Sequence, residues 1–297
     1  MLPVTEHENP RTASIDRAST LDALRLINDE DKTVALAVER VLPQIADAAE
    51  KIVERLRNGG RLFYVGTGTS GRLGVLDSAE IPPTYGVSYE LVQGIIAGGH
   101  EALYQASEAS EDKRESGAED LRTRGVTGGD AVIGIAASGR TPYTIGAVEY
   151  ARGLGSFTAC IACTPDSELE KSVDVAIVPV VGPEAITGST RMKAGTAQKL
   201  VLNMISTVAM IRLGYVRGNR MTNVKPSNEK LKDRSLRILM AETGLDRSTA
   251  NEMLNNAGGD LRVALVMFGT GEGREAAHRL LISQNYVVEK ALEANKK

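Results

Sequence analysis

The sequence predicts an α/β fold in which helices cover both faces of a parallel sheet. Strands and helices alternate from residue 61 onward, and strands are expected at 61–66, 88–95, 130–136, 157–163 and 173–179. Several of these segments are apolar at successive positions, which indicates that both faces of the sheet are buried. Ligands bind such sheets at the carboxyl ends of the strands, so the loops after 61–66 and 130–136 are the first places to look for a site.

Helical patterns fill the remaining segments of the large domain. Residues 1–20 are expected to form an irregular arm, followed by two helices that break near residues 28–32. Further helices are expected near 70–80, between 98 and 123, at 142–154 and at 189–213. The first of these should end near Glu80, because Pro82 and Pro83 cannot donate backbone hydrogen bonds within a helix.

The C-terminal part reads as a small helical module. Residues 214–227 contain Gly218-Asn219 and Pro226 and are typical of a linker. Four helices are expected beyond it, at 228–243, 246–258, 260–268 and 272–293. The second and third should be capped by Asp246 and Asp260.

The bulk composition is that of a soluble globular protein. The chain has 297 residues, of which 42% are hydrophobic and 25% charged, enough for one large domain and a smaller one. A net charge of −3 gives no general attraction for nucleic acid or an anionic membrane. No apolar run approaches the roughly 20 residues that span a bilayer. The polar N-terminus shows no signal peptide, so a cytoplasmic location is expected.

The cysteines and histidines do not suggest a metal site. Cys160 and Cys163 lie in a predicted buried strand, where residues three apart point to opposite faces, so core packing is the expected role. His7, His100 and His278 have no ligand spacing. No metal is expected.

A glycine- and hydroxyl-rich stretch, Gly66-Thr-Gly-Thr-Ser-Gly-Arg72, follows the first predicted strand. Its glycines spell the dinucleotide motif G-x-G-x-x-G. Its other residues are Thr67, Thr69, Ser70 and Arg72, whose hydroxyls and guanidinium suit the several oxygens of a terminal phosphate better than a pyrophosphate. Amide groups at the start of the following helix would also face an anion. The stretch therefore predicts a phosphosugar site.

Two further hydroxyl-rich loops precede predicted helices, Ala137-Ser-Gly-Arg-Thr141 and Thr187-Gly-Ser-Thr-Arg-Met-Lys193. Serine and threonine before a helix are often only N-caps, and a nearby arginine such as Arg140 can be a solvated surface residue. Three such loops in one domain nevertheless indicate a shared binding site.

Carboxylates accompany these loops. Glu80 is expected at a helix C-terminus, where the helix dipole disfavours a negative charge, so its presence suggests a function. Glu111 and Asp112 could instead be acids of the first turn of a helix, and Glu184 precedes the third loop. Carboxylates beside a phosphosugar suggest general acid–base chemistry rather than phosphate transfer.

These residues resemble a known family. The run from Gly66 to Glu80 with Pro82-Pro83, followed by Gly98-Gly99 and Glu111-Asp112, resembles the N-acetylmuramic acid 6-phosphate etherases. The run Gly182-Pro-Glu-Ala-Ile-Thr-Gly-Ser-Thr-Arg-Met-Lys-Ala-Gly-Thr-Ala-Gln-Lys199 is similar to the signature that this family shares with glucokinase regulatory proteins. The resemblance covers nearly the whole chain, including Thr5-Glu6.

The resemblance implies an architecture and a reaction. It implies a sugar isomerase (SIS) domain at about 52–215, a three-layer αβα sandwich with a five-stranded parallel sheet. Residues 1–51 would be an N-terminal arm and helices, and 228–297 the helical module. It also implies a homodimer without a cofactor that cleaves the lactyl ether of N-acetylmuramic acid 6-phosphate in cell-wall recycling.

The resemblance also implies roles for single residues. Glu80 would donate a proton to the departing lactate, Glu111 would be the second acid–base group, and Asp112 is a further candidate for removing the carbon-2 proton. The loop positions assign phosphate binding to Thr69, Ser70, Ser138 and Thr141. The remaining expected substrate contacts are Thr67, Arg72, Gly139, Glu184, Ser189 and Lys193.

Two other functions share these features. A phosphosugar sensor like the glucokinase regulatory protein would bind without catalysis, but it has two SIS domains and this chain has room for one. A ketose–aldose phosphosugar isomerase would share the phosphate loops, but the prolines after Glu80 and the 182–199 signature disfavour it.

Overall fold

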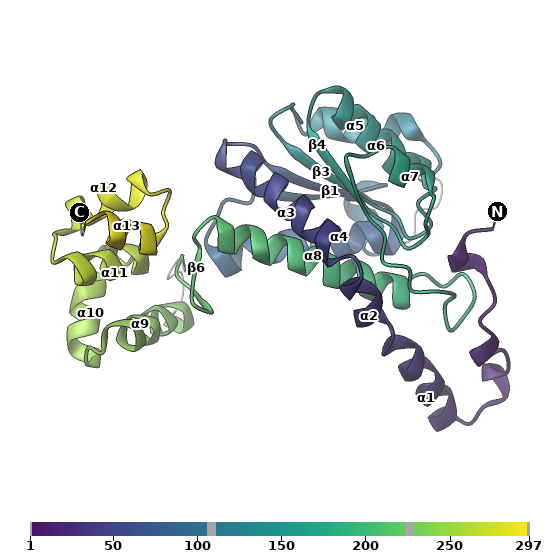
Figure 1. Ribbon diagram of the computed structural model, residues 1–297, viewed down its shortest axis with the longest axis horizontal. Coiled ribbons are helices and arrows are strands. Elements are labelled where there is room, and N and C mark those ends of the chain that lie inside the picture. Colours follow the sequence, from purple (N-terminus) through teal and green to yellow (C-terminus); the bar gives the residue numbers. More distant parts are fainter. Residues whose placement is uncertain (1, 106–110, 224–228, 296–297) are drawn as a thin grey trace. The chain divides into compact units, whose positions relative to one another are not determined.

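The computed structural model describes residues 2–105, 111–223 and 229–295. Contacts divide the chain into two compact units, Met1–Ala79 with Tyr89–Ser206 and Glu80–Ser88 with Thr207–Lys297. The first unit holds a parallel sheet and the second holds a cluster of short helices (Figure 1). The domain boundaries expected at 52, 215 and 228 stay a prediction.

The sheet of the first unit has five parallel strands in the order β2-β1-β3-β4-β5. They are β1 (Leu62–Gly66), β2 (Val92–Ile96), β3 (Ala131–Ile135), β4 (Phe157–Ile161) and β5 (Val175–Ile177). Gly66 pairs with Ile96 on one side and with Ile135 on the other, so β1, β2 and β3 end together. The predicted α/β class with a five-stranded parallel sheet is confirmed.

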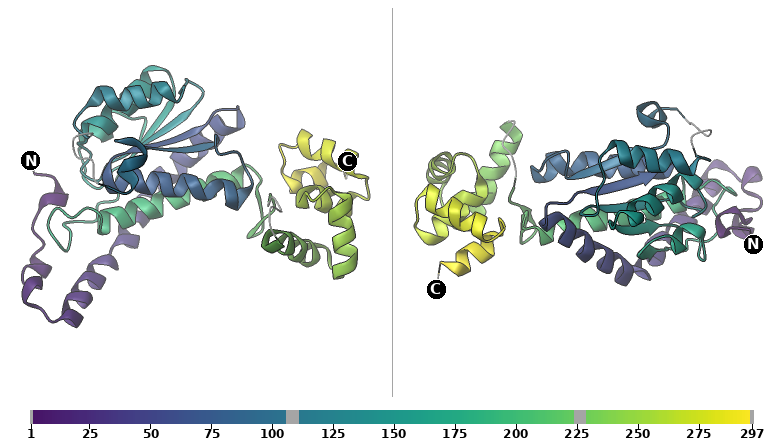
Figure 2. Two further views of the ribbon diagram at one scale, coloured as in Figure 1. Left: turned by 180° about the vertical axis from the view of Figure 1, so that it is seen from behind. Right: turned by 90° about the horizontal axis from the view of Figure 1, so that it is seen from above.

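Helices cover both faces of this sheet (Figures 1 and 2). One face carries α5 (Arg114–Thr123), α6 (Pro142–Gly153) and α7 (Glu168–Lys171), and the other carries α3 (Leu42–Arg57), α4 (Gly68–Tyr85) and α8 (Lys193–Arg212). The alternation of side chains along β1 explains this division. Phe63 and Val65 pack in the core cluster of α5 and α6, whereas the Tyr64 hydroxyl donates to Asp77 of α4.

The N-terminal region has more elements than the sequence predicted. The expected arm contains the 3-10 turns η1 (Val4–Glu6), η2 (Pro10–Thr12) and η3 (Ile15–Arg17). Three helices follow instead of two, α1 (Thr20–Asp31), α2 (Val34–Glu39) and α3. The second break has a local cause, because Pro43 lies in the first turn of α3, where proline is favoured and cannot continue a preceding helix.

The prediction that α4 ends near Glu80 is wrong. The helix runs through Pro82 and Pro83 to Tyr85, and its last turn is closed by Gly86 N–H donating to the Pro82 carbonyl at 2.8 Å. Ala79 is exposed, so solvent can hydrate a carbonyl that Pro83 leaves unpaired. Glu80 therefore lies inside the helix, and the reasoning from a carboxylate at the helix C-terminus does not apply.

Other bounds differ modestly from expectation. The segment expected to be helical at 98–123 contains η4 (Gly99–Leu103) and α5, with residues 106–110 outside the described part of the chain. The long helix α8 begins at Lys193, four residues after the expected start at 189.

The second unit is mostly helical. The expected linker contains a short hairpin, β6 (Val216–Arg217) and β7 (Arg220–Met221). Five helices follow: α9 (Glu229–Thr243), α10 (Arg247–Asn256), α11 (Leu261–Thr270), α12 (Arg274–Ser283) and α13 (Val288–Ala294). Asp246 and Asp260 cap α10 and α11 as predicted. The single helix expected at 272–293 is instead divided into α12 and α13. The break lies at Asn285 and Tyr286, which have positive φ angles of 53° and 61° that an α-helix does not allow.

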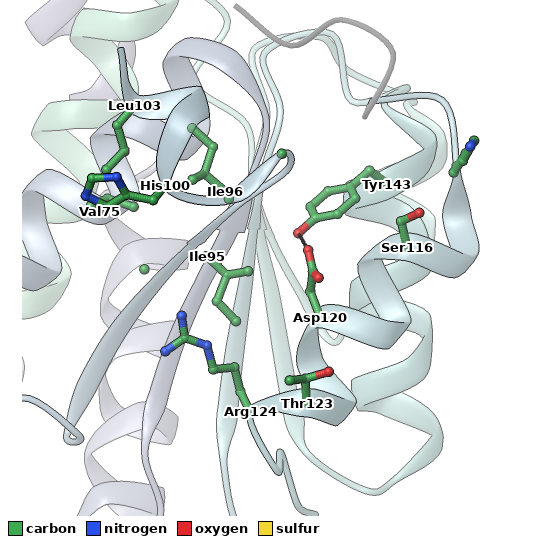
Figure 3. Close-up of a pocket in the computed structure, with 14 residues that line it drawn as sticks. Val75, Ile95, Ile96, His100, Leu103, Ser116, Asp120, Thr123, Arg124 and Tyr143 are labelled. Atoms are coloured by element: carbon green, nitrogen blue, oxygen red, sulfur yellow. Dashed lines mark hydrogen bonds between the residues drawn. The ribbon is translucent and has the colours of Figure 1, made fainter. Parts of the chain in front are cut away.

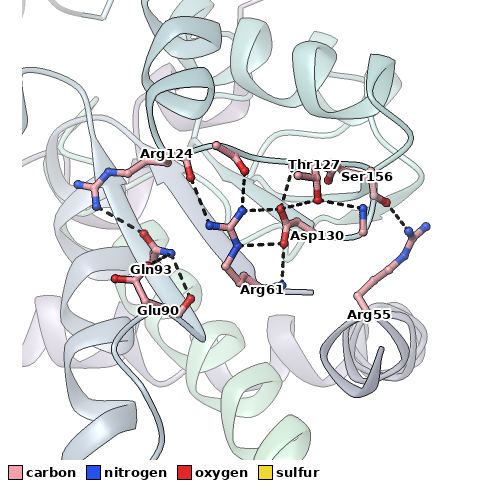
Figure 4. A network of polar contacts seen from close by, with 11 residues as sticks. Arg55, Arg61, Glu90, Gln93, Arg124, Thr127, Asp130 and Ser156 are labelled. Atoms are coloured by element: carbon pink, nitrogen blue, oxygen red, sulfur yellow. Dashed lines mark hydrogen bonds and ion pairs between the residues drawn. The ribbon is translucent and has the colours of Figure 1, made fainter. Parts of the chain in front are cut away.

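A buried carboxylate fixes the amino ends of β1 and β3 (Figure 4). Asp130 is 2% exposed and accepts from the backbone N–H groups of Arg61 and Thr127, both at 2.8 Å. The Arg61 guanidinium donates to the same carboxylate at 2.9 Å. Burial alone would raise the pKa of Asp130, but hydrogen bonds from Arg61 and Thr127 hold it below its usual range. This end of the sheet is therefore held by charge and hydrogen bonds.

Replacing Asp130 by asparagine should lower the free energy of unfolding by about 2–4 kcal/mol, because an amide NH₂ would face N–H donors. Urea denaturation at pH 7 measures this loss. The contribution is present above the unfolded pKa of about 4 and is lost as the pH falls through the lower folded pKa, so the gap between the two proteins should narrow in acid.

Asp47→Asn is the matched control, because Asp47 pairs with Lys51 on the surface of α3. Its effect should stay within about 0.5 kcal/mol. An equal loss in both variants would mean that the Asp130 contacts do not stabilise the fold.

Candidate phosphosugar site

The loop between β1 and α4 holds the predicted ligands Thr67, Thr69 and Ser70. It is tight, because a Cβ on Gly71 would lie 2.6 Å from the Gly66 carbonyl oxygen and 2.7 Å from a side-chain carbon of Ile96. The helix begins at Gly68, which has a φ of 50°, a conformation that favours glycine. The glycines therefore bring the hydroxyls and the first amides of α4 together at the carboxyl edge of the sheet.

The loop between β3 and α6 carries Ser138, Gly139 and Thr141 at the same edge. Gly139 has a φ of 64°, and a Cβ on it would lie 2.3 Å from the Ser167 hydroxyl oxygen. The Ser138 hydroxyl oxygen accepts from Arg140 N–H at 3.3 Å. Thr141 occupies the N-cap position of α6, yet within the described contacts its side chain makes no capping hydrogen bond. Its hydroxyl is therefore not used to cap the helix.

The third loop reaches the first through α8. A Cβ on Gly195 would lie 3.5 Å from the Thr69 methyl carbon. One turn further along α8, Gln198 Oε1 accepts from the Ser70 hydroxyl at 3.0 Å. The structure thus packs the first turns of α8 against the loop of Thr69 and Ser70.

Glu184 caps α8 from outside the helix. Its side chain is buried, and its two carboxylate oxygens accept from the backbone N–H groups of Lys193 and Ala194, both at 2.9 Å. Burial raises the pKa of Glu184, while the two backbone hydrogen bonds act in the opposite direction. The carboxylate complements the positive end of the helix dipole.

Lys193 forms a buried ion pair. Its Nζ donates to Glu30 Oε2 at 2.6 Å, and both side chains are 2% exposed. Arg11 contacts the other Glu30 oxygen at 2.7 Å. Burial alone would raise the pKa of Glu30, but hydrogen bonds from Lys193 and Asn9 and the charges of Lys193 and Arg11 hold it below its usual range.

The predicted sugar contacts in this region therefore differ in accessibility. Glu184 and Lys193 are buried and engaged with protein groups, and this structure does not present either to a ligand. Ser189 is half-buried in the loop before α8, where its backbone N–H donates to the Ile186 carbonyl at 3.0 Å. Its contact with sugar stays a prediction.

The N-terminal arm packs against this same loop, which the sequence reasoning missed. The Thr12 hydroxyl donates to the Ala185 carbonyl at 2.8 Å, and the Asn9 amide donates to the Pro183 carbonyl at 3.3 Å. A Cβ on Gly188 would lie 3.1 Å from a carboxylate oxygen of Glu6. The signal available in the sequence was Thr5-Glu6, which belongs to the family resemblance.

Glu111 is the predicted acid that the structure brings to the hydroxyl loops. Its Oε1 lies 3.5 Å from the position of a Cβ on Gly68. Its backbone carbonyl accepts from Tyr143 N–H at 3.0 Å, which ties it to the start of α6. Asp112 follows it and is exposed.

Glu80 lies exposed on α4, one turn after Asp77. Asp77 is buried and accepts from Tyr64, from Asn203 at 2.7 Å and from Ser206 at 3.2 Å. Burial raises the pKa of Asp77, and the three hydrogen bonds lower it in part. These contacts fix the rotation of α4 about its axis at Asp77.

The Arg72 side chain forms hydrogen bonds with the protein backbone. Its guanidinium donates to the carbonyls of Leu103 at 3.2 Å and Gln105 at 3.3 Å. Its predicted contact with substrate stays a prediction.

A cavity of about 640 Å³ is lined by residues of α4, β2, η4, α5 and α6. Figure 3 shows Tyr143 and Asp120 in its wall pointing toward one another, with a hydrogen bond of 2.5 Å between them. His100 and Arg124 also line it. All predicted site residues are described in the structure, and none of them lines this cavity.

The two cysteines lie in the core, as predicted. Cys160 and Cys163 are buried, and burial raises the pKa of each thiol to about 12. Within residues 2–105, 111–223 and 229–295, no cluster of His, Cys, Asp and Glu could hold a metal ion. Among the described helices, none has the length and apolarity needed to cross a membrane.

Comparison with known proteins identifies the family. Residues 44–152 match the family described as glucokinase regulatory protein N-terminal SIS domain. The chain is 58% identical over 268 residues to the N-acetylmuramic acid 6-phosphate etherase of Symbiobacterium thermophilum, a match covering 90% of this chain and 89% of that protein. The chain belongs to the N-acetylmuramic acid 6-phosphate etherase family. It is an enzyme, and the resemblance found in the sequence is confirmed.

Two further comparisons agree. The etherase of Photorhabdus laumondii is 52% identical over 278 residues, covering 94% of this chain and 92% of that protein. A solved structure from Bacteroides fragilis, described as a phosphosugar isomerase involved in capsule formation, has a TM-score of 0.51 at 19% identity. It covers 73% of this chain and 97% of its own, and it shows a shared fold.

The contribution of the Glu30–Lys193 ion pair to stability can be measured without an activity assay. Glu30→Gln should lower the free energy of unfolding by about 3–5 kcal/mol, because it leaves the charge of Lys193 buried and unpaired. The double variant Glu30→Met with Lys193→Met should lose less, because it removes both charges. Chemical denaturation of the wild type and the two variants measures the difference.

Asp29→Asn is the control on the same helix, since Asp29 pairs with Lys32 in solvent. Its effect should be under about 0.5 kcal/mol. A double variant less stable than Glu30→Gln would contradict the view that pairing, rather than the shape of the side chains, is what matters here.

Proposed function

We propose that the enzyme cleaves the D-lactyl ether of N-acetylmuramic acid 6-phosphate. Lactate is eliminated and water is added, which gives N-acetylglucosamine 6-phosphate and D-lactate. Membership of the etherase family supports this substrate. The single structural observation that supports the chemistry is that Glu111 Oε1 lies 3.5 Å from the position of a Cβ on Gly68, because a carboxylate beside the hydroxyl-rich loop is suited to acid–base work.

The phosphate is assigned to the loops after β1 and β3. Thr69, Ser70, Ser138 and Thr141 supply hydroxyl donors, and α4 and α6 direct their first amides toward the same edge of the sheet. Thr67 and Gly139 shape the two loops. The uncommitted capping position of Thr141 supports its role as a donor to the phosphate.

The reaction has no redox step, and each of its two stages, elimination and hydration, moves a proton to a base and a proton from an acid. In the open-chain sugar, the proton on carbon 2 lies next to the aldehyde and can be removed by a base. The lactyl oxygen on carbon 3 leaves with a proton from an acid, which forms a double bond between carbons 2 and 3. Water then gives up a proton to a base as its oxygen bonds to carbon 3, and carbon 2 takes a proton back from an acid. We assign the acid to Glu80 and the second acid–base role to Glu111, with Asp112 as a further candidate for the carbon-2 base.

The proposal includes the class and setting of the enzyme. The reaction is that of a carbon–oxygen lyase that needs no cofactor, since water enters, lactate leaves and no electrons are exchanged. We propose a homodimer on the family resemblance and a cytoplasmic location, which suits two unpaired thiols. The SIS domain is assigned to residues 52–215.

The purified enzyme should release lactate from N-acetylmuramic acid 6-phosphate without added metal or nucleotide, and a coupled lactate assay measures it. In heavy-oxygen water the label should enter carbon 3 of the sugar, because water adds there after elimination. Label in the lactate would instead indicate displacement at the lactyl carbon. Binding of the phosphosugar with no lactate release would favour a sensor, and ketose formation would favour an isomerase.

Glu80→Gln and Glu111→Gln should each lower kcat by about 10²- to 10⁴-fold, because glutamine cannot exchange a proton with the substrate. Steady-state kinetics and product binding by calorimetry measure turnover and affinity separately. Glu54→Gln, an exposed acid on α3, is the control and should leave kcat unchanged. Full activity in either test variant would remove that residue from the mechanism.

A further inference from the structure

The buried side-chain amide of Gln198, next to the loop of Thr69 and Ser70, uses only one of its two polar atoms in a hydrogen bond within the described part of the chain. Gln198 is 1% exposed, and its Oε1 accepts from the Ser70 hydroxyl at 3.0 Å. Its Nε2 is buried and has no hydrogen-bond partner among the described residues. Buried amide donors without a partner are uncommon in folded proteins, and an unpaired one calls for an explanation. Ser70 itself keeps 8% exposure at the edge of the sheet.

The surroundings of Gln198 hold its backbone in place. Glu184 caps the start of α8, and the Lys193–Glu30 pair fixes the first residue of the helix. Gly195, which lies on the same helix face as Gln198, packs against Thr69. Rotation of the amide about its last torsion is then the movement that most easily changes its hydrogen bonds.

Counting hydrogen bonds distinguishes the two orientations of this amide. In the orientation described, the Ser70 proton is given to Gln198, so the hydroxyl cannot donate to a ligand. If the amide turns over, Nε2 donates to the Ser70 oxygen, and the Ser70 proton becomes available. Without a ligand each orientation contains one hydrogen bond, but with a phosphate oxygen nearby the second contains two. Chained hydrogen bonds also strengthen one another.

We propose that Gln198 is a positioning residue that controls the Ser70 hydroxyl. When the Gln198 amide turns over, Ser70 stops donating its hydrogen bond to Gln198 and donates it to the phosphate of the ligand. A phosphomonoester drives the switch, because its oxygen accepts the released proton and the chain runs from Gln198 Nε2 to Ser70 to phosphate. The inference rests on the proposed phosphate role of Ser70. It makes Gln198 a determinant of preference for phosphorylated over unphosphorylated sugars.

Two substitutions separate donation from packing. Gln198→Glu introduces a carboxylate that takes the Ser70 proton and repels the phosphate, so KM should rise at least about tenfold at pH 7.5 with little change in kcat, roughly the change expected from losing one charge-assisted hydrogen bond. Gln198→Met keeps the length but loses the donor, and its KM should rise severalfold. Gln44→Glu, on the exposed surface of α3, is the matched control and should change neither constant.

Two readouts exclude a merely structural role. The KM defect of Gln198→Glu, relative to wild type at each pH, should shrink as the pH falls, because a protonated carboxyl can again donate to Ser70. The defect of Gln198→Met should not. In a Ser70→Ala background, Gln198→Met should have no further effect on KM, because the chain is already broken. Three outcomes would overturn the proposal. They are an unchanged KM in Gln198→Glu, a KM defect in Gln198→Glu that does not vary with pH, and a double variant of Ser70→Ala with Gln198→Met whose KM defect is the product of the two single defects.

Failure of the proposed reaction can be told apart from failure of this inference. Inorganic phosphate is the probe, and its Kd is measured by calorimetry in wild type, Gln198→Glu and Gln198→Met. Weaker phosphate binding in both variants, with unchanged melting temperatures, supports the switch even if no lactate is released. Equal Kd values in all three proteins would overturn it even if the etherase reaction proceeds.

Discussion

The start of α8 is fixed by a carboxylate that does not belong to the helix. Glu184 is buried, and its two oxygens take the N–H groups of Lys193 and Ala194, which would otherwise be unpaired in the interior. The side chain of Lys193 is neutralised by Glu30 from α1. Gly195 and Gln198 of α8 contact the loop that contains Thr69 and Ser70. The cap at the start of α8 therefore helps to fix the position of that loop.

The two ends of the sheet are built by different means. At the amino ends of β1 and β3, Asp130 gathers the N–H groups of Arg61 and Thr127 into a dense network. At the carboxyl ends, close glycine packing holds the backbone, and among the described contacts the Thr141 side chain makes no capping hydrogen bond. A rigid end opposite a loop-built end is the arrangement that lets a scaffold place reactive groups.

The sequence predicted the parts of the fold that depend on local patterns. Apolar runs identified the strands, and glycine and hydroxyl spacing identified the loops after β1 and β3. The predicted end of α4 was wrong, because the helix continues through Pro82 and Pro83. The exposure of Ala79, whose carbonyl Pro83 leaves unpaired, is a tertiary property that the sequence does not give. The buried role of Lys193 was also missed. Its partner Glu30 lies 163 residues away, so no local pattern separates a buried ion pair from a ligand-binding lysine.

The separation of 163 residues between Glu30 and Lys193 also affects when their contact can form during synthesis of the chain. The ribosome releases the N-terminal arm and α1 first, but their partners Pro183, Ala185 and Lys193 are synthesised only when more than 60% of the 297 residues have been joined. During that time Glu30 has no buried partner, and α1 has little to pack against. Forming such long-range contacts late is slow, since a large loop must close. Docking of the arm on the loop before α8 therefore has to wait until residues 183–185 are available.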